Sequence, residues 1–373
     1  MEKSCPADDV NFGNESSRPL RCGATMTSDR SHCNQIPKAY IRPLSERPRL
    51  DEVALSDDIS LIDLTDLNGP NRQLAIHQIQ RACQEDGFFH VINHGVPDTD
   101  VNTMLAVATE FFTMPTEFRE QFYSEDPSSV VRLSTSFNVH KENVCNWRYY
   151  LRHHCYPLEK YIDAWPSRPH AYREVVGKYC REVRALVIQL LAAISESLGL
   201  EPHFLDKALG NHAQHMAINY YPRCPNPELT FGLPAHSDPN ALTVLLQGHV
   251  SGLQVLRNGR WCAVQPIPNA FVVNLGDQLE VLSNGIYKSA IHRAVVNCSE
   301  ARISVPTFYC PSPDAVIQPA PGLITCDNPA RYRKFTYEEY YEKFWSKDLV
   351  EKTCLNSFTT DGLDANTTAP DDK

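Results

Sequence analysis

From about residue 214 onward, the sequence is a succession of short apolar runs separated by turn residues. Short runs rich in β-branched and aromatic residues predict β-strands, and Asn258-Gly259 between two of them is a strong hairpin signal. Many short strands at regular spacing favour a β-sandwich, a jelly roll or a small barrel. The runs are residues 216–221, 242–246, 253–256, 261–264, 271–275, 294–296 and 303–308.

The part of the chain before residue 214 has helical periodicity and two early strands. Residues 61–64 and 88–92 are short apolar runs that predict strands. The strongest helix is predicted over residues 171–198 and ends at Gly199. Its apolar stripe consists of Val176, Tyr179, Val183, Leu186, Leu190 and Ile194. The expected fold class is therefore mainly β with α, with a helical N-terminal region packed on a double-sheet β core.

The two ends of the chain differ from its middle in composition. Residues 1–35 are polar and lack apolar periodicity, and residues 355–373 are rich in Asp, Thr and Asn, so we expect a disordered extension and a disordered tail. Between them we place a mostly helical N-terminal region at residues 36–205. The β core is expected at residues 206–315, and a C-terminal helical segment at residues 316–354.

Charge and composition exclude several classes of partner. The net charge is -10, which gives no support for nucleic-acid binding, because such proteins usually carry a basic face. No apolar stretch reaches the length of a membrane span, and the N-terminus has no signal-peptide core. The thirteen cysteines form no Cys-x-x-Cys pair. We expect reduced thiols in a cytoplasmic protein, with a nuclear location also open.

A His-x-Asp pair is the first candidate for chemistry. On a strand, His236 and Asp238 would point to the same face, because side chains alternate with a period of two, and Pro239 marks the strand's end. An imidazole and a carboxylate supply two ligands of the 2-His-1-carboxylate triad that binds Fe(II). Such a pair is common by chance. The candidates for a third ligand are His212, His215, His249 and His292, of which His292 precedes an apolar run.

A second pair lies one strand after His292. Arg302 and Ser304 also share a face if they lie on a strand. A guanidinium fork beside a hydroxyl suits a carboxylate. An isolated Arg-x-Ser is usually an arginine with a solvated head. The order of the motifs along strand-like segments is what favours a functional interpretation.

The sequence resembles the plant 2-oxoglutarate/iron(II) oxygenase family, which contains flavonoid dioxygenases and gibberellin oxidases. The resemblance covers most of the chain except residues 1–35. Its iron motifs resemble residues 236–243 and 289–297, and its co-substrate motif resembles residues 302–304. Further matching segments are residues 36–43, 62–64, 87–96 and 219–222.

The resemblance implies a double-stranded β-helix, or jelly roll, with helices packed around it. It implies that His236, Asp238 and His292 bind iron, that Arg302 and Ser304 hold the distal carboxylate of 2-oxoglutarate, and that Tyr221 contacts the same co-substrate. Asn219 lies in the same motif, and its role stays open. The implied cofactors are Fe(II), 2-oxoglutarate and O2, with ascorbate as reductant. The family places His94 in a structural turn, and Ser237 is expected to point away from the metal.

The substrate is predicted from a narrower resemblance. Residues 147–159 and 305–311 resemble the downy-mildew-resistance subgroup, which includes salicylate hydroxylases and some flavone synthases. Phe308 stands where flavonoid enzymes stack a substrate ring. We expect oxidation of a small aromatic metabolite, first salicylate hydroxylation at the 5- or 3-position. The alternative is flavone-synthase-type desaturation, or hydroxylation, of a flavanone.

Two other classes of protein remain as hypotheses. A catalytically silent binding protein of the same fold would not need intact metal and co-substrate motifs. A zinc hydrolase would have no evident use for Arg302 and Ser304. No obligate protein partner, nucleic acid or membrane is expected as a partner.

Overall fold

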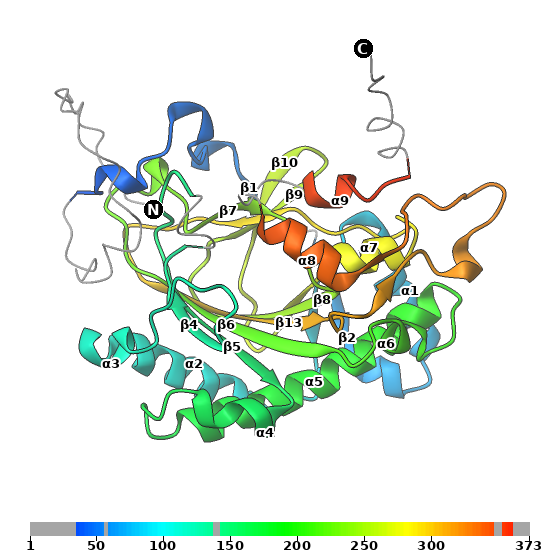
Figure 1. Ribbon diagram of the computed structural model, residues 1–373, viewed down its shortest axis with the longest axis horizontal. Coiled ribbons are helices and arrows are strands. Elements are labelled where there is room, and N and C mark those ends of the chain that lie inside the picture. The colour runs from blue at the N-terminus through cyan, green and yellow to red at the C-terminus, as the bar shows by residue number, and fades with distance from the viewer. Residues whose placement is uncertain (1–34, 56–58, 137–141, 347–352, 361–373) are drawn as a thin grey trace, which may run out of the picture.

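Two β-sheets form the jelly-roll core of the protein (Figure 1). Residues of both sheets line a cavity between them. The coordinates are a computed structural model and describe residues 35–55, 59–136, 142–346 and 353–360. The larger sheet has the strand order β2-β3-β11-β8-β13-β6-β5-β4, and the smaller sheet has the order β1-β10-β9-β12-β7. The expected extension at residues 1–35 lies almost wholly outside the described residues.

The strands of the larger sheet come from both halves of the chain. They are β2 (Leu61–Asp63), β3 (Phe88–Ile92), β4 (Val131–Ser134), β5 (Tyr149–Tyr156), β6 (Ala213–Tyr221), β8 (Leu242–Gln247), β11 (Phe271–Leu275) and β13 (Arg302–Cys310). Residues 36–205 thus contribute four strands to this sheet in addition to their helices. The β core is therefore continuous with the N-terminal region.

The smaller sheet is built from five short strands. They are β1 (Ala54–Leu55), β7 (Leu233–His236), β9 (Leu253–Arg257), β10 (Arg260–Val264) and β12 (His292–Ala294). The hairpin predicted at Asn258-Gly259 is confirmed, since Arg257 pairs with Arg260 and both turn residues have positive φ (49° and 76°). The strand predicted at residues 294–296 is wrong by two residues. β12 already begins at His292, because that residue pairs with β7 and β9.

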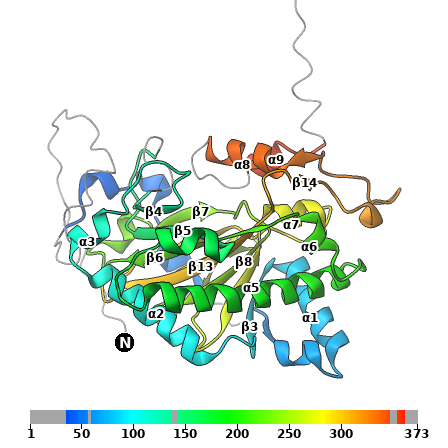
Figure 2. The ribbon, with the colours of Figure 1, turned by 60° about the horizontal axis from the view of Figure 1, so that its bottom comes forward.

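Helices cover the outer face of the larger sheet (Figure 2). They are α1 (Arg72–Glu85), α2 (Asp98–Thr113), α3 (Thr116–Glu120), α4 (Leu158–Tyr161), α5 (Tyr172–Ser197) and α6 (Phe204–Ala208). The long helix α5 confirms the predicted helix, and all six residues of its predicted stripe are buried. It ends before Gly199, which has a φ of +73°. Both α1 and α2 pack against α5.

The C-terminal part of the chain folds back over the core. It contains α7 (Asp277–Leu282), the two-stranded sheet β14 (Val316–Ile317) and β15 (Phe335–Thr336), α8 (Tyr337–Trp345) and α9 (Thr353–Asn356). Leu355 and Phe358, which the sequence places in the expected tail, are buried. Phe358 packs against the rings of Phe335 and Tyr340. The described chain is therefore anchored up to residue 360.

Two further expectations concern membranes and cysteines. Within the described ranges, no helix is long and apolar enough to cross a membrane. Nine of the cysteines that the structure describes are free thiols, as expected. Cys145 is disulfide-bonded, so the expectation of reduced thiols is wrong at that position.

The packing of α5 predicts a stability difference between two neighbouring residues. Leu190 is fully buried, whereas the side chain of Ile188 on the same helix is 38% exposed. We expect Leu190→Ala to lower the free energy of unfolding by about 2–5 kcal/mol, because it leaves a cavity between helix and sheet. Ile188→Ala is the control, with a change of under about 1 kcal/mol. Equal losses in denaturant titrations of the two variants would contradict this view of the core.

Candidate metal and co-substrate site

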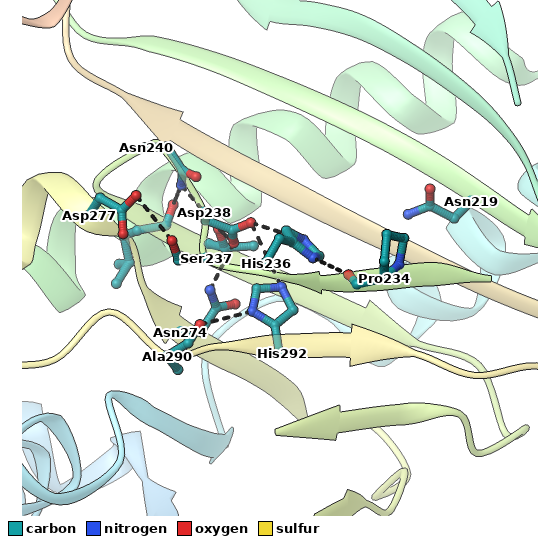
Figure 3. Close-up of polar contacts among 12 residues, drawn as sticks. Asn219, Pro234, His236, Ser237, Asp238, Asn240, Asn274, Asp277, Ala290 and His292 are labelled. Atoms are coloured by element: carbon teal, nitrogen blue, oxygen red, sulfur yellow. Dashed lines mark hydrogen bonds and ion pairs between the residues drawn. The ribbon is translucent and has the colours of Figure 1, made fainter. Parts of the chain in front are cut away.

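Three side chains converge where the two sheets meet. Ligand atoms of His236, Asp238 and His292 lie within 4.8 Å of one another, and no other such group was found among the described residues. The Nε2 atoms of the two histidines are 3.7 and 3.8 Å from Oδ1 of Asp238. Figure 3 shows both rings turned toward this carboxylate. The site residues predicted from the motifs are thus brought together.

His236 and Asp238 do not share a strand face, contrary to the sequence prediction. His236 is the last residue of β7, so Asp238 lies beyond the strand and not on its face. The loop that carries Asp238 is held by the start of α7. The backbone N–H of Asp277 donates to the Asp238 carbonyl (2.8 Å), and that of Gly276 donates to the carbonyl of Ala241 (2.8 Å). A Cβ on Gly276 would meet the Asn240 carbonyl oxygen at 2.1 Å, so only glycine permits this approach.

The histidine rings are oriented by backbone carbonyls. Nδ1 of His236 lies 2.9 Å from the Pro234 carbonyl, and Nδ1 of His292 lies 3.1 Å from the Ala290 carbonyl. A carbonyl only accepts, so Nδ1 carries the proton in each ring and the Nε2 lone pair faces Asp238. This is the arrangement that metal-binding histidines show, because the second nitrogen fixes the tautomer and the ring plane.

The carboxylate of Asp238 is fixed by two buried donors. Thr243 Oγ1 (2.6 Å) and Asn274 Nδ2 (2.8 Å) both donate to Oδ2, which leaves Oδ1 toward the histidines. Burial raises the pKa of Asp238, but His292, His236 and these hydrogen bonds outweigh it and lower the pKa overall. Ser237 points away as expected and donates to Asp277 (3.2 Å).

The protonation states fit a metal ion. Burial and the neighbouring His292 lower the pKa of His236 to about 3, so its imidazole is neutral at physiological pH. Two neutral imidazoles and one carboxylate form the facial triad that leaves coordination positions open on Fe(II). The other candidate histidines are not part of this group. His212 contacts Asp206 (2.9 Å), and the exposed His249 contacts Glu300 (3.2 Å). His215 lines the cavity, where its ring lies against that of His154.

A second group of polar side chains lies on β13 and β6 and lines the same cavity as His236, Asp238 and His292. Arg302 pairs in register with Tyr221, and Ser304 pairs with Asn219. The guanidinium of Arg302 lies 5.1 Å from the centre of the Tyr221 ring, and its Nη1 donates to Ser304 Oγ (3.4 Å). Arg302 is 2% exposed. The predicted shared face is therefore present, and it suits one carboxylate group.

Both groups line one cavity between the sheets. Phe308 lines it as well, together with Tyr337, Tyr341, Phe344 and Trp345 of α8. The sequence interpretation missed the contribution of β5, whose residues Tyr150 and Arg152 line the cavity next to Arg148. It missed this strand because the three apolar residues at its start are followed directly by Arg152, His153 and His154.

His94 lies in a structural turn, as expected. Its Nδ1 accepts from the backbone N–H of Val96 (3.2 Å), and its Nε2 donates to the carbonyl of Asn269 (2.9 Å). Both ring nitrogens are therefore used within the fold. His94 does not line the cavity.

Comparison with known proteins agrees with this geometry. The family described as the 2OG-Fe(II) oxygenase superfamily matches residues 212–311. The family described as non-haem dioxygenase in morphine synthesis N-terminal matches residues 59–170. The chain belongs to the 2OG-Fe(II) oxygenase superfamily. It is a dioxygenase that uses Fe(II) and 2-oxoglutarate.

Several relatives match most of the chain. Protein DMR6-LIKE OXYGENASE 2 of Arabidopsis thaliana is 56% identical over 87% of this chain and 94% of its own. Protein DOWNY MILDEW RESISTANCE 6 of the same plant is 53% identical over 87% and 95%. Flavanone 3-dioxygenase 2 of Oryza sativa subsp. japonica is 52% identical over 87% and 94%. The similarity to the downy-mildew-resistance subgroup is thus confirmed.

A solved structure supports the fold. The crystal structure of JOX2 in complex with 2OG, Fe, and JA has a TM-score of 0.82 and 33% sequence identity. It covers 92% of this chain and 98% of that chain. The jelly-roll core with packed helices is therefore the arrangement that this oxygenase shares with a relative holding iron and 2-oxoglutarate.

The Asp238 contacts predict the effect of removing one donor. Thr243→Val keeps the side-chain shape but removes the hydroxyl that donates to Oδ2. We expect metal affinity to fall about 10- to 100-fold, because loss of an orienting partner loosens the ligand. Thr307→Val, at another fully buried threonine of the same sheet, is the control. Anaerobic Fe(II) titration measures both, and equal affinity in the two variants would contradict a positioning role for Thr243.

Proposed function

We propose that His236, Asp238 and His292 hold Fe(II), and that Arg302, Ser304 and Tyr221 bind 2-oxoglutarate. The observation that carries this assignment is that one cavity contains both groups, each with its own orienting hydrogen bonds. The charges of Fe²⁺, Arg302, Asp238 and the 2-oxoglutarate dianion cancel. Such a set is compatible with burial, which an unbalanced set would oppose.

We further propose that the enzyme hydroxylates a small aromatic metabolite, with salicylate oxidised at the 5- or 3-position as the leading substrate. Phe308 and the rings of α8 line the cavity and form an apolar wall suited to a planar ring. The similarity to the downy-mildew-resistance subgroup supports this choice.

The chain's own residues supply orientation and exclusion of water. Bound iron and 2-oxoglutarate supply the oxygen-activating chemistry. His236 and Asp238 are 8% and 3% exposed, which keeps bulk water from the metal ligands. Arg302 and Ser304 fix one carboxylate of the co-substrate by charge-assisted hydrogen bonds. The cavity wall then limits which substrate carbon approaches the metal.

A flavanone is the second candidate substrate. The support is the rice relative named flavanone 3-dioxygenase 2, which is 52% identical. A flavanone is larger than salicylate and carries no carboxylate. A site for salicylate therefore needs a positive group to pair with its carboxylate, whereas a site for a flavanone does not.

We also propose a cytoplasmic location and a small-molecule partner. The free thiols among the described cysteines support the first proposal. The enclosed cavity, whose lining is mainly apolar with a few polar groups, supports the second.

Substrate-coupled succinate formation tests the proposed reaction. Purified protein with Fe(II), 2-oxoglutarate, ascorbate and O2 is expected to form succinate together with dihydroxybenzoate when salicylate is added. The products are measured by mass spectrometry, and naringenin is the flavanone comparator. His236→Ala is the inactive control. Coupled turnover with naringenin but not with salicylate would replace the leading substrate by the second one.

The co-substrate assignment has a separate test. Arg302→Ala is expected to raise the KM for 2-oxoglutarate about 10- to 100-fold, because a hydrogen-bonded charge pair is lost. Iron affinity should stay near that of the wild type, since Arg302 is not among the three metal-binding candidates. Arg302→Lys keeps the charge and should give an intermediate KM. An unchanged KM in Arg302→Ala would show that the carboxylate binds elsewhere.

A further inference from the structure

Two buried arginines in the cavity lack an acidic partner. Arg148 and Arg152 are 6% and 8% exposed, and both line the cavity. Within the described part of the chain, neither forms an ion pair with a carboxylate. Buried arginines are normally paired, because an isolated charge in an apolar environment is unfavourable. These two positive charges therefore require an explanation.

The hydrogen bonds of the two side chains leave donors free. Nη1 of Arg148 donates to Asn219 Oδ1 (3.2 Å), and its guanidinium lies 4.6 Å from the centre of the Tyr150 ring. Nη2 of Arg152 donates to the carbonyls of Pro127 (2.6 Å) and Ser129 (2.8 Å). Nε of each arginine is buried without a hydrogen-bond partner. Neutral oxygens thus position both groups without neutralising them.

The other arginines of the core have named partners. Arg257, which is partly exposed, is paired with Asp86 at 2.7 Å. The buried Arg132 does not line the cavity; it donates to the Ser124 carbonyl (3.0 Å) and to the Tyr150 hydroxyl (2.7 Å), and Glu142 is close enough to raise its pKa. Arg293 alternates with His292 along β12, lies between the rings of Trp261 and Phe231, and donates to Gln254. The charge of Arg302 is already balanced within the iron and 2-oxoglutarate set. Arg148 and Arg152 remain as unbalanced positive charge on the cavity wall.

The strand register places these arginines beside the co-substrate group and not within it. Tyr150 pairs with Asn219, which pairs with Ser304 on the next strand. Arg152 lies one step further along β5 and pairs with Ala217. Arg152 and Ala217 both line the cavity, and Nη2 of Arg152 is held by the carbonyls of Pro127 and Ser129, just before β4. The arginine pair is therefore two strands away from Arg302, and all three residues line the same cavity.

Aromatic side chains adjoin this positive wall. Arg152 is close enough to Tyr341 of α8 to act on its pKa, which burial raises and Arg152 partly lowers. Phe308 pairs with His215, whose neighbour across the next strand is His154. Burial lowers the pKa of His215 well below its ordinary value, so this ring adds no charge. Aromatic side chains and the two arginines thus line the same cavity.

We propose that Arg148 and Arg152 form a second anion subsite, which binds the carboxylate of an aromatic acid substrate. The subsite rests on the proposed function and narrows it to carboxylate-bearing aromatic compounds, against neutral flavanones. The substrate's carboxylate would offset part of the charge of the two guanidinium groups, and its ring would lie against the aromatic residues that line the same cavity.

Binding without turnover tests the subsite directly. The probes are salicylate and salicylamide, which has the same ring and hydroxyl but no charge. Affinities are measured by calorimetry under anaerobic conditions, with Fe(II) and saturating 2-oxoglutarate so that Arg302 is occupied. Wild type is expected to bind salicylate about 10- to 100-fold more tightly than salicylamide. Equal affinities for the two probes would overturn the proposal.

Substitutions at Arg148 and Arg152 test whether these two residues bind the carboxylate. Arg152→Met and Arg148→Met are each expected to lose most of the preference for salicylate while salicylamide affinity stays the same, and Arg152→Lys should retain part of it. Arg184→Met is the matched control, because Arg184 stacks on Tyr156 outside the cavity and also has a buried nitrogen without a partner. An unchanged preference in both Met variants, or an equal loss for both probes, would contradict the subsite.

The two proposals fail in different ways. If salicylate binds through the arginines but no aromatic acid is turned over, the proposed reaction is wrong and the anion subsite stands. If salicylate is turned over with the same KM in wild type and in both Met variants, the reaction stands and the subsite is wrong. Thermal unfolding of each variant with Fe(II) and 2-oxoglutarate confirms that the fold is kept, and the wild-type comparison of probes does not depend on any variant.

Discussion

The position of the Asp238 carboxylate depends on both sheets at once. Its Oδ2 accepts from Thr243 on β8 and from Asn274 on β11, which are strands of the larger sheet. Its Oδ1 faces His236 and His292, which lie on strands of the smaller sheet. A metal ion held by these three groups would therefore join the two sheets inside the cavity. Packing of the helices on the larger sheet matters to the chemistry because it holds Thr243 and Asn274 in position to orient Asp238.

A period of two along the strands explains the rest of the cavity. On β13 the inward residues include Arg302, Ser304 and Phe308, while the alternate residues Val305 and Thr307 face the helices. Antiparallel pairing carries the same alternation across β6 and β5. One sheet face thus presents the co-substrate group, an aromatic group and the two arginines in adjacent rows. A one-residue slip of β5 would turn Arg152 toward the helices.

One wall of the cavity carries positive charge, although the protein as a whole is acidic. The whole chain has a net charge of -10, yet Arg148 and Arg152 are positive and buried. The net charge of the chain does not predict the charge of the cavity, since buried groups respond to their near neighbours and are screened little by salt. An enclosed positive wall favours an anion even where the surface as a whole repels one.

The sequence by itself determined the strand-rich second half, the α5 helix, the hairpin at Asn258-Gly259, and the order of His236, Asp238, His292, Arg302 and Ser304. These follow from local periodicity, turn chemistry and motif order, which need no knowledge of distant contacts. Sequence reasoning favoured His292 among four candidate histidines because it precedes an apolar run and because the family resemblance matches it, and the structure brings it next to His236 and Asp238. Only the tertiary structure decided that Asp238 lies beyond its strand, held by the start of α7, and that Arg148 and the β5 residue Arg152 line the cavity. Both depend on pairings between segments far apart in the chain. In β5 the polar run Arg152-His153-His154 interrupts the apolar residues, so the sequence alone does not show which side chains of this strand face the cavity.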